Sequence, residues 1–115
     1  MPKLTEEIIF DIIKSILIKE YKIKKHIDYN TSINCDLGID GDDAKELLDE
    51  IAYLIFQKNY LVEFYNFDFN MYFSVEGLSI KLLLKKIKYK CLTIKDLVKY
   101  ILEHNIFYEN SKYKI

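Results

Sequence analysis

Apolar residues recur with the period of an α-helix in three stretches of the chain, which polar and aromatic stretches separate. The first helical stretch follows Thr5, a residue that can cap a helix, and its first turn carries Glu6 and Glu7, which suit the positive end of a helix. Residues 22–34 are polar and have no such period, so we expect a long loop there. The apolar positions of the first helix are Ile9, Ile12, Ile13, Ile16 and Leu17.

A second helix is predicted after Asp40, which can act as its cap. Asp43, three positions later, can reach back to the amide of the cap in a variant of the capping box. The spacing of the residues that follow predicts an amphipathic helix with one buried and one solvated face. The apolar face comprises Ala44, Leu47, Leu48, Ile51, Ala52 and Ile55, and the acidic face comprises Asp42, Asp43, Glu46, Asp49 and Glu50.

The second half of the chain contains an aromatic segment, a lysine-rich segment and a further helical pattern. Residues 59–77 are rich in aromatic side chains, and we predict a packed loop followed by a short helix starting at Asn70. A helix is favoured over a strand for residues 78–90. The last helix is predicted to begin at Thr93, with Asp96 completing a second capping-box variant, and to end near Asn105. Together these elements predict an all-α fold and a single domain over residues 1–115.

The charge of the chain is nearly balanced but unevenly distributed. All 17 basic residues are lysines, and 18 acids bring the formal net charge to −1. This balance argues against a nucleic-acid partner. Seven acids and one lysine lie between Asp36 and Glu50, whereas seven lysines and one acid lie between Lys81 and Lys99. The chain is therefore expected to have an acidic part and a basic part, the latter being either a functional or merely a solvated surface.

No residue pattern indicates catalysis, a bound cofactor or a metal site. Cys35 and Cys91 stand 56 positions apart in no metal or redox spacing, which predicts two reduced thiols. His26 and His104 have no recognisable spacing to either cysteine, so a nucleophilic enzyme is not expected. No apolar run approaches the ~18 residues of a membrane span, and the first residues do not resemble a secretory signal. A cytoplasmic, non-enzymatic protein without stable membrane insertion is the resulting expectation.

One segment resembles a known family. The sequence D-L-G-I-D-G-D-D-A-K-E-L-L, from Asp36 to Leu48, is similar to the start of the second helix of acyl carrier proteins. In that family a serine after the aspartate receives a 4′-phosphopantetheine arm, but here the position is Gly41, and Asp42 replaces the usual leucine. The D-G-D-D-A pattern resembles instead a group of small acyl-carrier-like proteins of unknown function that lack this serine.

The resemblance implies an acyl-carrier-like four-helix bundle with a helical insertion, residues 78–90, before the last helix. It also implies a non-catalytic protein-interaction module without phosphopantetheine, whose acidic second helix binds a basic patch on an unknown protein partner. The partner-binding candidates are Asp36, Asp40, Asp42, Asp43, Glu46, Asp49 and Glu50.

Two alternative functions remain open at this point. The first is an unconventional acyl or peptidyl carrier that attaches its prosthetic group elsewhere. The second is a small helical bundle that binds an apolar ligand between its helices. The residues expected to line such a cavity are Phe64, Phe67, Phe69, Tyr72 and Phe73.

Overall fold

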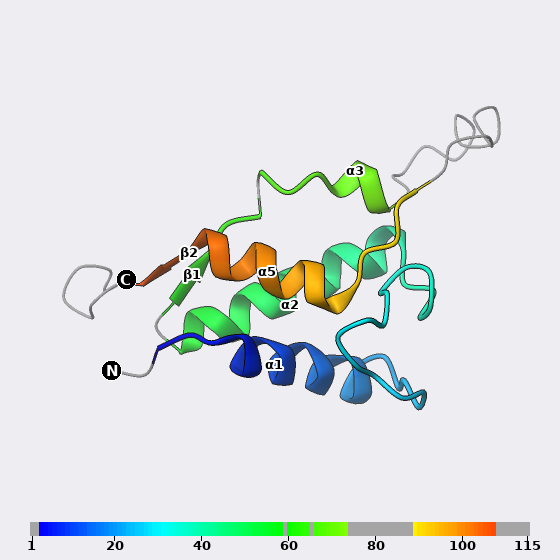
Figure 1. Ribbon diagram of the computed structural model, residues 1–115, viewed down its shortest axis with the longest axis horizontal. Helices are drawn as coiled ribbons and strands as arrows, with labels where there is room; N and C mark the ends of the chain where they lie inside the picture. The colour runs from blue at the N-terminus through cyan, green and yellow to red at the C-terminus, as the bar shows by residue number, and fades with distance from the viewer. Residues whose placement is uncertain (1–2, 59, 65, 74–88, 108–115) are drawn as a thin grey trace.

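The computed structural model describes residues 3–58, 60–64, 66–73 and 89–107. Within these ranges the chain is mostly helical, with four helices and a small two-stranded antiparallel sheet (Figure 1). The elements are, in chain order, α1 (Glu6–Lys19), α2 (Gly41–Gln57), β1 (Tyr60–Val62), α3 (Phe69–Tyr72), α5 (Ile94–His104) and β2 (Asn105–Phe107).

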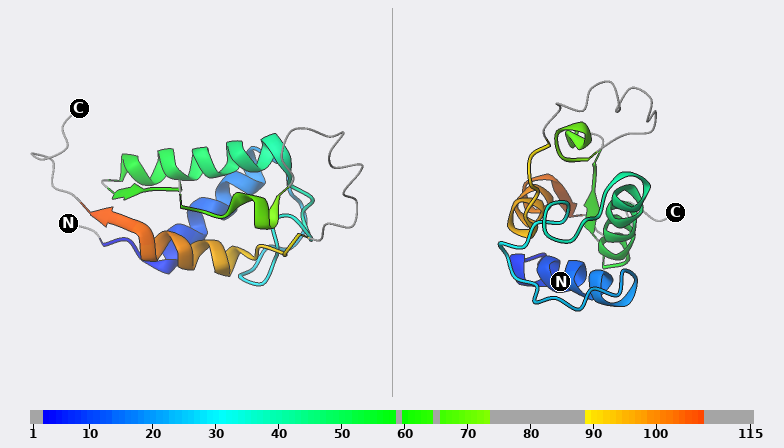
Figure 2. Two further views of the ribbon diagram at one scale, coloured as in Figure 1. Left: turned by 90° about the horizontal axis from the view of Figure 1, so that it is seen from above. Right: turned by 90° about the vertical axis from the view of Figure 1, so that its right-hand side faces the viewer.

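The three long helices enclose one hydrophobic core. Seen end-on, α2 and α5 lie on opposite sides above α1, and α3 lies at the far side from α1 (Figure 2). Each long helix contributes fully buried isoleucines, among them Ile13 from α1, Ile51 from α2 and Ile101 from α5. The helical spacing of the apolar residues thus identifies the faces that pack together, and all three predicted helices are confirmed.

The two strands connect the ends of α2 and α5. β1 follows α2, β2 follows α5, and the strands pair antiparallel with Leu61 opposite Ile106. The prediction of an all-α fold is therefore wrong on this point. Each strand has only three residues, too few to produce a readable alternation in the sequence, and pairing becomes possible only because α2 and α5 end near each other.

The predicted starts of α1, α2 and α5 are confirmed, but the expected side-chain cap is present only at α1 and α5. The Thr5 hydroxyl accepts a hydrogen bond from the amide of Ile8 at 3.2 Å, and the Thr93 hydroxyl accepts one from the amide of Asp96 at 3.1 Å. Asp40 does occupy the cap position of α2, yet its side chain makes no capping hydrogen bond. The short helix predicted from Asn70 is present as α3, one residue earlier.

The segment between α1 and α2, residues 20–40, is long but closely packed, and we refer to it as the connecting loop. Ile27, Ile33 and Ile39 point into the core from it. Its backbone also pairs with the segment before α5: the amide of Ile33 donates to the carbonyl of Leu92 at 2.7 Å. The connecting loop is therefore fixed against the segment that leads into α5. Most of the helix predicted at 78–90 lies outside the described residues.

Candidate functional site

The acidic face of α2 is exposed as its sequence pattern predicts. Asp42, Asp43, Glu46 and Asp49 are exposed and Glu50 is half-buried. The opposite face of the helix is buried in the core through Ala44, Leu47, Leu48, Ile51 and Ile55. Because the apolar face packs into the core, Asp42, Asp43, Glu46 and Asp49 lie on the exposed side of the helix.

The two remaining candidate acids precede the helix and differ from the others. The carboxylate of Asp36 accepts a hydrogen bond from the amide of Ser32 at 2.8 Å, and the amide of Asp36 donates to the Ser32 hydroxyl at 2.8 Å. Lys25 Nζ donates to the Asp36 carbonyl at 3.0 Å. Asp36 therefore stabilises the turn before α2, and Asp40 is exposed at the helix cap.

Gly41, which occupies the position of the carrier serine, is the first residue of α2 and has a φ of +58°. A β-carbon added there would meet no atom within 4 Å, so the surroundings leave room for a side chain. The backbone conformation, however, is left-handed, which residues with a β-carbon rarely adopt. The backbone conformation at position 41 therefore favours glycine, which also lacks the hydroxyl of the carrier serine.

Tyr21, which the sequence pattern did not single out, joins the connecting loop to the acidic helix. Its hydroxyl donates to the carbonyl of Asp43 at 2.8 Å. Burial raises the pKa of Tyr21 to about 12, and the negative charges of Asp43 and Glu46 contribute, followed by those of Glu20 and Glu50. Both burial and these neighbouring carboxylates disfavour the ionised form of Tyr21.

Asn34 connects three segments that are distant in sequence. Its side-chain Nδ2 donates to the carbonyls of Tyr72 and Lys90, both at 2.7 Å. Its Oδ1 accepts from the amides of Cys35 and Leu92, both at 2.9 Å. Nothing in the sequence distinguishes Asn34 from the other polar residues of the loop, because all but one of these partners come from elsewhere in the chain.

Next to Asn34 the two cysteines form a disulfide, Cys35–Cys91. The prediction of two reduced thiols is therefore wrong. Sequence spacing gave no indication of the bond, because only the pairing of the connecting loop with the segment before α5 brings the two Cα atoms to 5.5 Å. Disulfides persist in oxidising environments and are rare in the cytosol, so the bridge argues against the expected cytoplasmic location.

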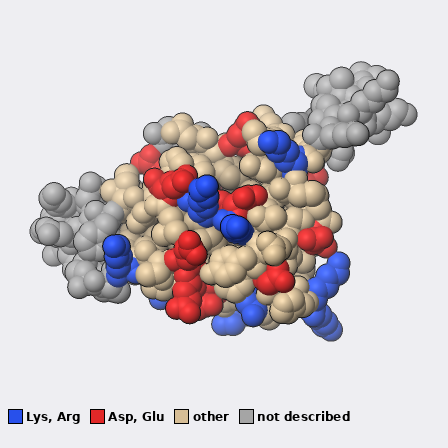
Figure 3. Space-filling model, viewed as in Figure 1, with Lys and Arg blue, Asp and Glu red and all other residues tan. Residues whose placement is uncertain are grey.

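The basic part of the chain is only partly described, since residues 81–88 lie outside the described ranges. Lys90, Lys95 and Lys99 are exposed. On the face that carries α5 and α1, acidic and basic side chains are interspersed and do not form one field of a single sign (Figure 3). The described lysines therefore give no indication of a polyanion-binding surface.

The aromatic residues expected to line a cavity pack on one another and on α5. The rings of Phe64 and Phe67 lie 5.7 and 5.1 Å from that of Tyr100, and the rings of Phe67 and Tyr72 lie 5.6 Å apart. Phe73 is buried in the core. These contacts are those of a packed cluster.

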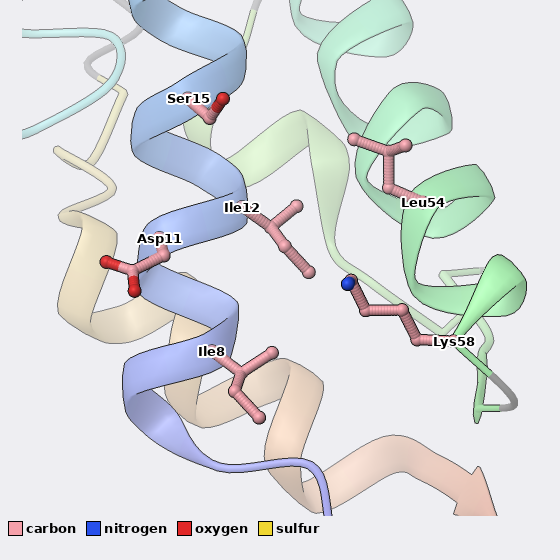
Figure 4. A pocket seen from close by; sticks show the side chains of 6 residues that line it. All are labelled: Ile8, Asp11, Ile12, Ser15, Leu54 and Lys58. Atoms are coloured by element: carbon pink, nitrogen blue, oxygen red, sulfur yellow. The ribbon is translucent and has the colours of Figure 1, made fainter. Parts of the chain in front are cut away.

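Two hollows on the described surface are lined by other residues. In one, of about 340 Å³, Ile8 and Ile12 of α1 point toward Lys58 at the end of α2 (Figure 4). The other, of about 540 Å³, is lined by Glu6, Tyr29, Asn30, Lys95, Val98 and Lys99.

The part of the chain that the structure describes shows neither a metal-binding cluster nor a membrane-spanning helix. There, no three His, Cys, Asp or Glu residues are placed to hold a metal ion together. Among the same residues, no helix combines the length and the apolar character needed to cross a membrane.

Comparison with models of protein families gives a match. A family model described as "Protein of unknown function (DUF1493)" matches residues 1–105, most of the chain. No curated protein and no solved structure matches the chain.

Proposed function

Because this chain belongs to the DUF1493 family, whose function is unknown, we propose a function from its own surface. It is a non-catalytic protein-interaction module that binds a partner through the acidic face of α2. The observation that carries this proposal is the exposed row of Asp42, Glu46 and Asp49 on a helix whose opposite face is buried.

The arrangement of the acids supports a role beyond solubility. Glu46 has acidic neighbours three and four positions away on both sides, and like charges at these spacings each destabilise a helix by roughly 0.2–0.5 kcal/mol. The positive end of the helix offsets this only for Asp42 and Asp43 in its first turn. A partner that brings lysines or arginines to this face would relieve the repulsion and be drawn to it at a higher rate.

The order of the elements supports an acyl-carrier-like plan for this module. A first helix, a long loop, an acidic second helix, a short helix and a last helix follow one another as in the family that the Asp36–Leu48 segment resembles. The two-stranded sheet departs from that plan. Gly41 has no side-chain oxygen that could form the phosphodiester of phosphopantetheine, so the proposed module carries no prosthetic group at this position.

The test uses charge reversal on α2. We expect Asp42→Lys with Glu46→Lys to abolish capture of the partner by the tagged protein, and to leave the helical circular-dichroism signal unchanged. The matched control is Glu7→Lys with Asp11→Lys, which reverses two exposed acids at the same i, i+4 spacing on α1. Retained capture by the α2 variant, or equal loss with the control, contradicts an interface on the acidic face.

The carrier alternative is tested by intact-mass measurement after incubation with coenzyme A and a phosphopantetheinyl transferase. On the proposal made here the mass stays unchanged. A gain of one phosphopantetheine mass overturns it and identifies an unconventional attachment site.

The apolar-ligand alternative has less support, because the aromatic rings expected to line a cavity contact each other and Tyr100.

A cytoplasmic location would be consistent with the proposed module only if the Cys35–Cys91 bridge is reduced there. Alkylation of the protein directly on cell lysis measures that state.

A further inference from the structure

The Cys35–Cys91 bridge lies at the surface of the molecule. Both cysteines are exposed, although they are separated by 56 positions in the sequence. Disulfides are opened by a thiolate that attacks one of the two sulfur atoms, so the rate depends on access to the bond. An exposed bridge therefore meets the first requirement for exchange in the folded protein.

The two segments that the bridge joins are also held together without it. The amide of Ile94 donates to the carbonyl of Thr31 at 2.9 Å, and the amide of Lys95 donates to the carbonyl of Tyr29 at 2.9 Å. Asn34 adds its hydrogen bonds to Lys90 and Leu92 on either side of Cys91. Opening the bridge thus leaves the connecting loop in contact with the segment before α5.

The hydrophobic core gives a second reason why the fold does not require the bond. Ile33 and Leu92, close to the cysteines along the chain, are themselves buried, at 0% and 1% exposure. The apolar contacts that dock the connecting loop are therefore independent of the sulfur atoms. The two thiols of the reduced protein stay near each other, and the bond can form again.

From these observations we propose that Cys35 and Cys91 are a reversible thiol–disulfide exchange site that operates in the folded protein, with a dithiol as its reductant. One thiolate of the dithiol attacks a bridge sulfur, forming a mixed disulfide and releasing the other cysteine as a thiolate. The second thiol of the dithiol then displaces the first cysteine. The protein gains two electrons and two protons, and the dithiol leaves as its own disulfide.

The exchange site adjoins the proposed interaction surface but does not depend on it. Cys35 precedes Asp36 in the turn that leads to α2, and its amide is held by Asn34 Oδ1. The redox state is therefore expected to affect this turn first, and the packing of α1, α2 and α5 least.

The experiment equilibrates the folded protein with graded ratios of reduced to oxidised dithiothreitol and then alkylates free thiols for intact-mass measurement. We expect the bridge to open fully without denaturant, with the helical circular-dichroism signal retained, and to close again as the intramolecular bond in oxidised dithiothreitol. A bridge that opens only in denaturant, or whose opening abolishes the helical signal, overturns the proposal, because the bond would then be a structural link.

Variants of Asn34 test whether the hydrogen-bonded segments keep the thiols together. Loss of its contacts lowers the effective concentration of one thiol at the other, so Asn34→Ala should open the bridge at a roughly tenfold lower ratio of reduced to oxidised reagent. Asn66→Ala, at an exposed asparagine elsewhere, is the control and should match the wild type. If Asn34→Ala does not fold, Asn34→Asp, which keeps the Oδ acceptor for Cys35 and Leu92, should show a smaller shift in the same direction. If the Asn34 variants and the control open at the same ratio of reduced to oxidised reagent, the proposal that the hydrogen bonds of Asn34 keep the two thiols together is overturned.

Discussion

Gly41, at the start of α2, differs in two ways from the serine of an acyl carrier protein. It has no hydroxyl, and its backbone is left-handed. Its φ of +58° places it in the region that glycine adopts without a steric penalty. The residue type at this position therefore affects the stability of the helix start as well as any chemistry there.

Gly41→Ala is expected to destabilise the protein by about 1–2 kcal/mol, because a β-carbon clashes with the backbone in this conformation even though no other atom is near. Urea unfolding followed by circular dichroism measures the change. Gly41→Asn is the control, since asparagine tolerates this region better, and it should cost less. An alanine variant as stable as the wild type would indicate that the helix start relaxes to a right-handed conformation.

Because of Tyr21, the stability of the folded protein depends on pH in the alkaline range. Its pKa is about 12 in the folded protein, against 10.0 as its ordinary value. Between these values the unfolded chain loses the phenol proton and the folded protein keeps it, so the unfolded state binds fewer protons and stability falls as pH rises. The contribution is fully present below pH 10 and is lost by about pH 12.

Tyr21→Phe should therefore show a shallower fall in the urea midpoint over this range, from a lower starting stability because the hydrogen bond to Asp43 is also removed. Burial also raises the pKa values of Tyr29, Tyr60 and Tyr72, so part of the decline remains in the variant. A decline as steep as that of the wild type would contradict the role of Tyr21.

At the scale of single elements, the long helices follow directly from their apolar spacing. In α1 the buried face consists of Ile9, Ile12, Ile13, Ile16 and Leu17, the same residues that the sequence pattern selects. The hydroxyls of Thr5 and Thr93 cap α1 and α5 as predicted, because such caps need only residues three positions apart. Elements of this kind can be predicted because their determinants are local.

Two isoleucines of α1 offer a matched test of that face. Ile13 is 0% exposed and Ile18 is 46% exposed. Ile13→Ala should destabilise the protein by about 2–5 kcal/mol, since it removes buried apolar contacts and leaves a cavity. Ile18→Ala should stay within about 0.5 kcal/mol of the wild type in the same unfolding measurement. Similar losses for both variants would mean that α1 is packed differently.

At the scale of the whole molecule, contacts between residues that are distant in sequence hold the helices and the connecting loop together. The β1–β2 pair joins the ends of α2 and α5, and Asn34 joins the connecting loop to α3 and to the segment before α5. The Cys35–Cys91 bridge adds a covalent link across 56 positions.

Replacing both cysteines, Cys35→Ser with Cys91→Ser, should lower the free energy of unfolding by up to about 4 kcal/mol, because a closed loop of this length restricts the unfolded chain. The helical signal at room temperature should be retained. Wild-type protein in excess dithiothreitol is the control and should have the same urea midpoint as the double variant. A lower midpoint for the variant would mean that the serines disturb the turn for reasons other than the missing bond.

The amino-acid sequence by itself determined the three long helices, two of their caps and the acidic face of α2, since each depends on residues within a few positions of one another. Only the tertiary structure decided the two-stranded sheet, the environment of Tyr21, the contacts of Asn34 and the pairing of Cys35 with Cys91. The physical reason is that these features require segments that come together only after the helices have packed. The spacing of residues along the chain does not indicate which distant segments will meet.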